Sequence, residues 1–341
     1  MDMAKKVQYE RGPYMNAELK ERCDLLVENR KVIAKAFAWD ASLMSLASAT
    51  LFTSNGLTAD SEKLKECMEI MKAKTNIFSE FRGNVRIPLI CKMALSDDPE
   101  KYFENVEALY ELLNQGKWLG NEYKIMAAIT ICDHAEEREY ELYVNRTNEI
   151  YSQMKQNHKW LTTDEDIPFA AMLAVSGLDI DKLIEEMELD YNILKGKFHD
   201  SNAVQSLSHV LALDEKPAEV KCAKVEAIFD ELKAIKHTYG TGYELATLGT
   251  LTMLDMPEKE LAEFIAEADD YLKRQKGFGD FVLGTKARRL YAAQLVLNQY
   301  GQGNKKADGV VLGSMLALTI ATEICLMLCV TSCTAASNAS H

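Results

Sequence analysis

The chain has 341 residues, is 48% hydrophobic, and carries a formal net charge of −13 from 39 basic and 52 acidic residues. This balance argues against nucleic acid as the main partner, because binding phosphates needs clustered lysine and arginine. It also argues against an anionic membrane surface, and we interpret it as a solvated acidic exterior. The length alone suggests two or three domains, but the repeat described below indicates one continuous body.

Residues 1–36 are interpreted as an irregular start followed by a charged helix that caps the repeat array. Leu19, Cys23, Leu26 and Ile33 fall on one face of this helix, as in an amphipathic helix. A stack of repeats needs such a terminal unit with a polar outer side.

Residues 37–300 repeat a pattern with a period of about 40 residues, which is typical of stacked helical units. An aromatic residue followed by small and polar residues marks each period, as in the run from Phe81 to Asn84. We call each run a hinge. We expect its glycine to supply the left-handed backbone that ends one helix, and its Asn, Asp or Ser to begin the next. The hinge aromatics, which we expect to wedge between units, are Phe81, Trp118, Trp160, Phe198, Tyr239 and Phe278.

Between successive hinges the sequence predicts two helices. The first is short and apolar, as in Pro168–Val175, and the second is longer with apolar residues on one side, as in Leu261, Phe264, Ile265 and Ala268. One such hairpin cannot bury its own apolar face, so neighbouring hairpins must stack. The sequence therefore predicts an all-α fold of stacked helical hairpins. This is either an α-solenoid, which is a right-handed superhelix, or alternatively a closed α/α toroid.

Residues 301–341 begin with a polar break and continue as an apolar helix. Small residues fall at every fourth position from Gly309 to Cys333, a pattern along which another helix can approach closely. The stretch 309–331 is long enough to span a bilayer, although Glu323 is costly at that depth. We expect a buried helix, or one that self-associates into a homo-oligomer, with a membrane anchor as the alternative.

No catalytic, cofactor-binding or metal-binding residue follows from the sequence, which lacks the GxxxxGK[ST], GxSxG and HExxH motifs. Cys132 and His134 fall in the acidic turn of a hairpin, where a structural role is the better interpretation. The run Asp164–Asp166 suits a helix start, where negative charge meets the helix dipole. Cys325, Cys329 and Cys333 are interpreted as packing residues of the last helix.

Five polar hinge residues differ most from unit to unit, and irregular positions of a repeat protein often carry its binding surface. We therefore predict a contact surface that contains Arg82, Arg86, Asn121, His199 and Asp200.

The layout resembles a family of uncharacterised proteins from Gram-positive bacteria, domain of unknown function 4003. The matching features are the opening helix after Gly12-Pro13, the hinge from Phe81 to Asn84, the later hinge from Tyr239 to Gly242, and the small-residue C-terminal helix. The resemblance implies a bacterial cytoplasmic protein and no catalytic residue.

The preferred hypothesis is a cytoplasmic binding or scaffolding protein, with no cofactor, that holds a protein or peptide on its concave helical face. Scattered cysteines, and a start that is charged rather than apolar, agree with a reducing cytoplasm. The first alternative is a toroid enzyme that gathers acidic side chains in a central pocket. The second is a tail-anchored membrane protein, which would be membrane-associated through its last helix.

Overall fold

The computed structural model describes residues 15–37, 42–77, 79–115 and 121–301. The apolar stretch on which the oligomer and membrane-anchor predictions depend lies outside these residues. Within them no strand occurs, and the all-α prediction is confirmed. No helix of the described part is long and apolar enough to cross a membrane.

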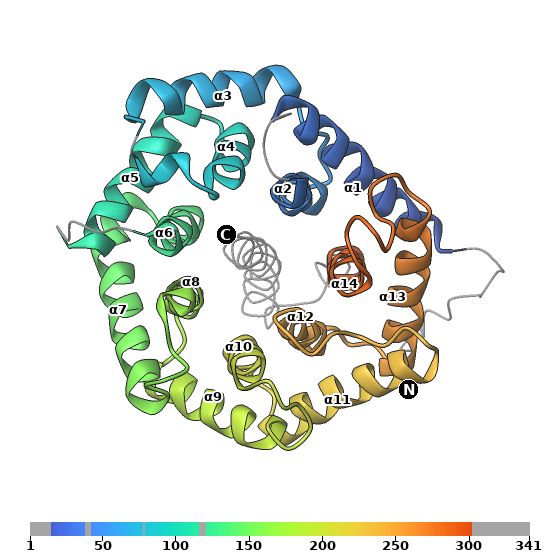
Figure 1. The fold of residues 1–341 in the computed structure, drawn as a ribbon. Helices are drawn as coiled ribbons and strands as arrows, with labels where there is room; N and C mark the ends of the chain where they lie inside the picture. The colour runs from blue at the N-terminus through green and yellow to red at the C-terminus, as the bar shows by residue number, and fades with distance from the viewer. Residues whose placement is uncertain (1–14, 38–41, 78, 116–120, 302–341) are drawn as a thin grey trace, which may run out of the picture.

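The helices alternate between an outer and an inner layer (Figure 1). The outer helices are α1 (Ala17–Ala36), α3 (Ser61–Lys74), α5 (Pro99–Asn114), α7 (Tyr140–Asn157), α9 (Ile180–Leu194), α11 (Ala218–Ala234) and α13 (Glu258–Lys273). The inner helices are α2 (Ser42–Ser54), α4 (Arg86–Leu95), α6 (Glu122–His134), α8 (Ile167–Val175), α10 (Ser201–Leu211), α12 (Leu245–Thr250) and α14 (Thr285–Gly301). Short 3-10 turns lie at η1 (Glu80–Arg82), η2 (Glu137–Glu139), η3 (Asp164–Asp166) and η4 (Leu251–Met253).

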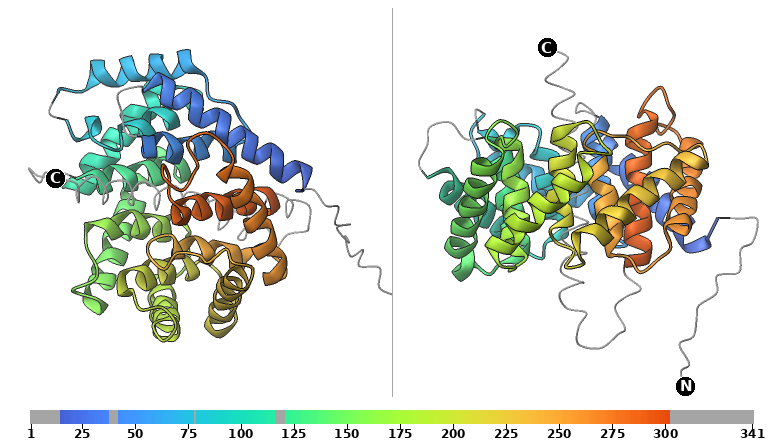
Figure 2. Two further views of the ribbon diagram at one scale, coloured as in Figure 1. Left: turned by 45° about the vertical axis from the view of Figure 1, so that its right-hand side comes forward. Right: turned by 90° about the horizontal axis from the view of Figure 1, so that it is seen from below.

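The hairpins follow one another round a ring, and the views in Figure 2 show the same two layers. The first helix packs on α2 and also contacts α13 and α14, the last two described helices. At this junction the Arg22 Nε donates to Gln299 at 3.2 Å, and Asn298 donates to Ser54 at 3.1 Å. The guanidinium of Arg30 lies over the ring of Phe278, 4.7 Å from its centroid.

The two layers differ in how they bury their side chains. All nine residues of α8 are buried, so this inner helix is covered on every side, as a helix that is apolar all round must be. The outer helix α13 instead buries one stripe that includes Leu261, Ile265 and Leu272. Residue spacing predicts both helix types well: the expected Pro168–Val175 is observed as Ile167–Val175.

The connections of the ring form two surfaces, which we name the hinge face and the turn face. The hinge face contains the connections from each outer helix to the next inner helix, and the turn face contains those from inner to outer. Hinges bond to hinges: Asn84 donates its backbone N–H to Glu122 at 2.6 Å, and Asn121 donates to Asp164 at 2.7 Å. Turns bond to turns: Thr252 donates to Asp214 at 2.8 Å.

Lysine or arginine side chains at similar positions of several outer helices hold the turn face together, which was not expected from the sequence. In several hairpins a side chain of the outer helix donates to backbone carbonyls where the next inner helix ends. The Arg146 guanidinium donates to Ala174 and Leu178 at 3.2 and 2.6 Å, and Lys224 donates to Leu254 at 2.6 Å. Because the last carbonyls of a helix lack partners within the helix, these cations satisfy them and complement the helix dipole.

Most hinge aromatics are buried, as expected for wedges between units. Phe81, Phe198, Tyr239 and Phe278 are each less than 5% exposed, whereas Trp118 lies outside the described residues. Trp160 is the exception, because its side chain is 90% exposed.

The hinge glycine Gly83 has a different structural role from the one predicted. Gly83 has φ −77°, so it does not adopt the left-handed conformation. A Cβ at this position would lie 2.1 Å from a carboxylate oxygen of Glu122 in the next hinge. Gly83 is therefore needed for close approach of the neighbouring hairpin. The left-handed helix end of α5 is formed by Gln115, with φ 49°.

Candidate functional site

The start of α8 gathers the densest set of polar contacts on the hinge face. Thr163 caps the turn η3 that leads into α8, and its side chain and that of Asp166 bond each other's backbone in a capping box. The three acids between Thr163 and Ile167 point to three different neighbours. Asp164 accepts from Asn121 at 2.7 Å and Tyr151 at 3.4 Å, and burial raises the pKa of Tyr151 to about 12.

Glu165 joins hinges that are far apart in sequence. One of its carboxylate oxygens accepts from the Tyr123 hydroxyl at 3.2 Å, and the other accepts from the Tyr243 hydroxyl at 3.0 Å. Tyr123 belongs to the first turn of α6, and Tyr243 lies just before α12. Burial and the Glu165 charge raise the pKa of Tyr243. This carboxylate therefore ties together hinges of three hairpins.

Asp166 lies below the surface beside a buried histidine. Its Oδ1 is 3.8 Å from Nδ1 of His209, which is 3% exposed and has no hydrogen-bond partner at Nδ1. Burial raises the pKa of Asp166 to about 7 and lowers the pKa of His209 to about 3. Burial disfavours the charged form of both groups. At neutral pH the imidazole is therefore neutral, and part of the acid is protonated.

His209 also lines a small cavity between α7, α9 and α10, with room for about one water molecule. His158 and Glu188 lie on the same wall, with Nε2 and Oε1 2.9 Å apart. The remaining walls include Met154 and Met187. A cluster with opposed pKa shifts at a cavity is a common feature of active sites, although structural polar networks produce the same shifts.

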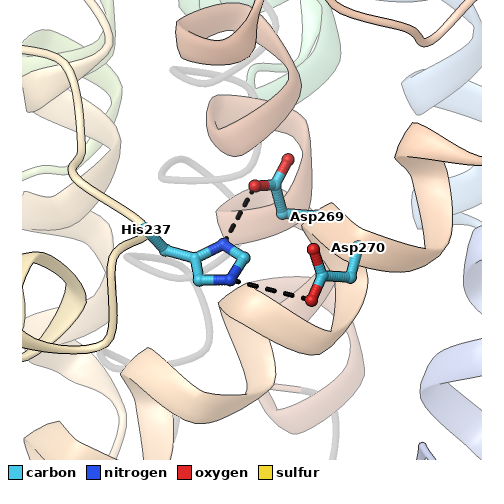
Figure 3. A group of neighbouring side chains, drawn as sticks. All are labelled: His237, Asp269 and Asp270. Carbon is cyan, nitrogen blue, oxygen red and sulfur yellow. Dashed lines mark hydrogen bonds and ion pairs between the residues drawn. The ribbon is translucent and has the colours of Figure 1, made fainter.

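A second cluster joins a hinge to α13 (Figure 3). His237 Nδ1 lies 3.0 Å from Asp269 Oδ2, and His237 Nε2 lies 3.7 Å from Asp270 Oδ2. One histidine and two carboxylates at such distances form a possible divalent metal site, and hard or borderline cations accept these ligands.

The surroundings of Asp269 favour a structural role for this cluster. Arg288 Nε donates to Oδ1 of Asp269 at 2.5 Å, and Arg289 Nε donates to Oδ2 at 3.0 Å. A metal ion would compete with two guanidinium groups for the same carboxylate. Arg289 also donates to the backbone carbonyl of Thr238. The arginines of α14 thus lock α13 to the hinge that precedes α12.

Cys132 and the acid beside it have partners in neighbouring segments. The Cys132 sulfur accepts from the Tyr140 hydroxyl at 3.8 Å, and Asp133 accepts from Lys92 at 2.6 Å and from Tyr102 at 2.8 Å. Burial raises the pKa of the Cys132 thiol to about 12, so the thiolate is scarce at neutral pH. These contacts support the structural interpretation of this turn.

All five residues of the predicted contact surface lie on the hinge face. Arg82 belongs to η1 and Arg86 begins α4. Asn121 and Asp200 cap α6 and α10 by accepting backbone N–H bonds. His199 is exposed beside Asp200. Their placement together agrees with a shared surface, but the two caps are also explained by local structure.

The contacts of Arg82 explain that side chain within its own hairpin. Its guanidinium donates to the backbone carbonyls of Lys72 and Thr75, at 2.8 and 2.7 Å. These carbonyls belong to the end of α3. Arg82 therefore closes a helix end and is only partly available to a partner.

Sequence reasoning missed the most exposed apolar side chains of the hinge face. Ile77 is 73% exposed, Trp160 is 90% exposed, and the neighbours Phe281 and Val282 are fully and 61% exposed. Each belongs to a connection from an outer to an inner helix. Trp160 was assigned to the wedges, and Phe281 follows the wedge Phe278. Phe281 was the available signal, because Asn, Thr, Ser or Gly stands three residues after the aromatic in the other hinges.

The outer helices carry charges that complement their dipoles. Every described outer helix has an acid in its first turn, and five of the seven have lysine in the last turn. Such ends can meet between neighbouring outer helices, because Lys74 of α3 lies 2.8 Å from Glu100 of α5. Further exposed lysines lie in the connections of the hinge face: Lys159, Lys195, Lys236 and Lys276.

The model of the family described as protein of unknown function DUF4003 matches residues 29–329. The chain belongs to this family. It is also similar to the uncharacterized protein YeaA of Bacillus subtilis (strain 168), with 24% identity over 245 residues that cover 70% of this chain and 72% of the relative. A search of solved structures gives no match. The family match includes most of the apolar stretch after residue 309, so this stretch belongs to the shared sequence pattern.

Proposed function

We propose that this member of the family is a binding or scaffolding protein that contacts a protein or peptide partner through its hinge face. The observation that carries the proposal is that the four most exposed large apolar side chains of the described residues all lie on that face: Ile77, Trp160, Phe281 and Val282, each more than 60% exposed. We interpret side chains of this kind on one face as contacts for a partner that spans several hairpins.

The proposal moves the contact surface away from the concave helical face expected from the sequence. All residues of the inner helix α8 are buried, and so are the residues of α10 from Ala203 to Leu211. These stretches offer no exposed side chain for a partner to bind. The hinge face carries the exposed apolar side chains named above, and it contains the five polar residues predicted for contact.

A catalytic role has weaker support. The best candidate is the pair Asp166 and His209, which combines shifted pKa values with a cavity. Catalysis requires a reacting atom within hydrogen-bond reach of the acid or base. Both side chains are more than nine-tenths buried. The outer acids Asp164 and Glu165 are engaged in bonds between hairpins.

The test is affinity purification of the full chain from its own cells, with mass spectrometry of bound proteins and small molecules. The wild type is compared with the triple variant Ile77→Ser, Trp160→Ser and Phe281→Ser. Leu142→Ser is the matched control, because Leu142 is 55% exposed at the start of α7 on the turn face.

We expect a stoichiometric partner with the wild type and the control, and its loss with the triple variant. A partner retained by the triple variant would exclude the hinge face. A bound metabolite in place of a partner would favour the catalytic alternative.

A further inference from the structure

The inner helices are buried on every side, including the side that faces the centre of the ring. Seven consecutive residues make about two turns of a helix, so they point in every direction around it. Unbroken runs of buried residues of this length or more occur at 125–131 in α6, 203–211 in α10 and 290–298 in α14, and over the whole of α8. These helices are therefore covered toward the centre as well as toward the outer layer.

Two of the inner helices show the direction of this burial. In α14, the side chain of Gln299 bonds to the outer helix α1. Leu290 stands nine residues earlier, which is two and a half turns, so it points away from α1. In α2, Thr53 accepts from α1, and Met44 stands nine residues earlier. Leu290 and Met44 are both only 4% exposed, although both point toward the centre.

The helices that pack on an inner helix lie beside it or outside it. For α8 they are the adjacent inner helices α6 and α10 and the outer helix α7 (Figure 1). For α14 they are the inner helix α12 and the outer helices α1 and α13. Within the described ranges, these main contacts leave the central side to be covered by another part of the chain.

One segment beyond the described ranges has the composition to cover an apolar surface. Residues 309–330 have Glu323 as their single charge. Residues 1–14 carry Asp, Glu, Lys and Arg, and the ranges 38–41 and 116–120 have at most five residues each. A helix that is apolar on all sides has to be buried, which describes α8 and the stretch 309–330 equally well.

The centre of the ring also has the size for one helix. Packed helices lie about 8–10 Å apart, so seven inner helices on a circle place their axes roughly 9–12 Å from its centre. That distance suits one further helix. Residues 302–308 follow the end of α14, and seven residues can span up to about 25 Å. The chain can therefore pass from α14 to the centre.

We propose that residues 309–330 form a helix that fills the centre of the ring and packs on the inner layer. Inner helices run from the hinge face to the turn face, so this helix enters at the turn face and runs antiparallel to them. Its small residues at every fourth position allow close approach. Glu323 lies past its middle, nearer the starts of the inner helices, whose dipoles favour a carboxylate. The surface is not the hinge face, so the inference goes beyond the proposed function and does not depend on it.

Photo-crosslinking of the full chain tests this placement. The chain is produced with photo-methionine, a diazirine analogue close to methionine in shape. Met315 and Met327 lie in the proposed helix, and Met44 lies on the central side of α2. After irradiation in dilute solution, mass spectrometry of the monomer should find peptides of 309–330 joined to several inner helices. Met68 of the outer helix α3 is the internal control and should give no link to that segment.

Two crosslinking results would overturn the proposal. Links between 309–330 and the inner helices that occur only in covalent dimers would show that the segment of a second copy covers the inner layer. A monomer in which 309–330 is linked to no inner helix would show that the segment lies elsewhere.

A substitution gives an independent measurement. Ala317→Arg puts a charge on the proposed central helix, so the urea concentration at half-unfolding should fall by about 1 M, because a buried charge needs a partner. Ala336→Arg is the matched control, since it makes the same change beyond the segment and should leave the midpoint at the wild-type value. Equal midpoints in the two variants would overturn the proposal, because position 317 would then be as open to water as position 336.

Discussion

Asp166 and Asp269 are both almost completely buried and both lie beside a histidine, but their electrostatic settings are opposite. Asp269 accepts from the guanidinium groups of Arg288 and Arg289. Asp166 accepts the backbone N–H of Thr163 and lies 3.8 Å from His209. Burial raises the pKa of Asp166 to about 7. A buried carboxylate stays charged where cations meet it, and otherwise burial drives it toward the neutral form.

The comparison also separates two ways of joining hairpins. At Asp269, the arginines of α14 hold α13 and a hinge by fixed opposite charges. At the start of α8, acids and hydroxyls share hydrogen bonds across three hairpins. The first type depends strongly on its charges, since removing one partner leaves an unpaired buried charge. The second type depends on individual hydrogen bonds, each of which contributes less to stability than a buried charge pair whose partner is removed.

The largest expected effect comes from breaking the charged cluster. Arg288→Met leaves Asp269 short of one cation, and it leaves the backbone carbonyl of Phe278 without its Arg288 donor. We expect the free energy of unfolding to fall by about 3–5 kcal/mol. Urea denaturation at neutral pH measures this change.

The control for this variant is Lys273→Met, which removes an exposed ion pair to Asp280 at 3.4 Å. Its effect should stay below about 1 kcal/mol. The double variant Arg288→Met and Asp269→Leu should recover part of the lost stability, because no buried charge remains. A loss below about 1 kcal/mol for Arg288→Met would contradict the role assigned to this cluster.

Asp166 and His209, the neutral pair, should make the free energy of unfolding depend on pH in opposite directions. The folded pKa of Asp166 is raised from 3.8 to about 7, so its contribution to stability is lost as pH rises through that window. The folded pKa of His209 is lowered from 6.5 to about 3, so its contribution is lost as pH falls through that window. In the wild type the two slopes oppose each other over the shared range.

Single substitutions separate the slopes. Asp166→Asn leaves the histidine slope, so stability falls as pH is lowered from about 6.5. His209→Gln leaves the acid slope, so stability falls as pH is raised from about 4 to about 7. Each slope reaches at most about 1.4 kcal/mol per pH unit. Urea denaturation across this range measures both slopes.

The control is Glu185→Gln, at an exposed position on α9, which should leave the pH profile of the wild type unchanged. If stability changes with pH in the same way in Asp166→Asn and His209→Gln, the two groups do not carry the opposed slopes assigned to them.

A smaller effect tests the cations of the turn face. Arg146→Met removes donors to the carbonyls of Ala174 and Leu178 while it keeps most of the apolar stem. We expect a loss of about 1–2 kcal/mol, since hydrogen bonds from charged groups are stronger than neutral ones. Lys182→Met on α9 is a control, because its side chain is exposed. If both variants unfold at the same urea concentration, the cation does not stabilise the end of α8.

The helical hairpins could be predicted from sequence because their punctuation is local. Proline, the hinge aromatics and the apolar stripes each depend on a few neighbouring residues, and this placed α8 within one residue. The curvature that brings α1 against α13 and α14 is a sum of small rotations per hairpin. Hydrophobic periodicity does not contain those rotations, so the sequence left the solenoid and the toroid as alternatives.

The contacts of the site could not be predicted for a related reason. Glu165 meets Tyr123 and Tyr243, which are 42 and 78 residues away. No local pattern indicates such partners. The exposure of Trp160 has the same origin: a hinge aromatic can turn inward or outward, and the neighbouring hairpins decide. The regular spacing of Arg22, Lys63, Arg146 and Lys224 was visible in the sequence, but its meaning depends on where each inner helix ends.

The smallest effect separates a structural cluster from a metal site at His237. His237→Gln removes a ring that lies 3.0 Å from Asp269, while Arg288 and Arg289 still neutralise the carboxylate. We expect a loss of about 1 kcal/mol or less. Zinc should raise the melting temperature of neither the wild type nor the variant, because an ion that binds the folded state stabilises it only if it displaces the arginines. Asp270→Asn is a matched control at the exposed carboxylate. If zinc raises the melting temperature of the wild type, and this rise is lost in both His237→Gln and Asp270→Asn, the cluster binds metal. Asp269 would then differ from Asp166 by belonging to a metal site as well as by its charged neighbours.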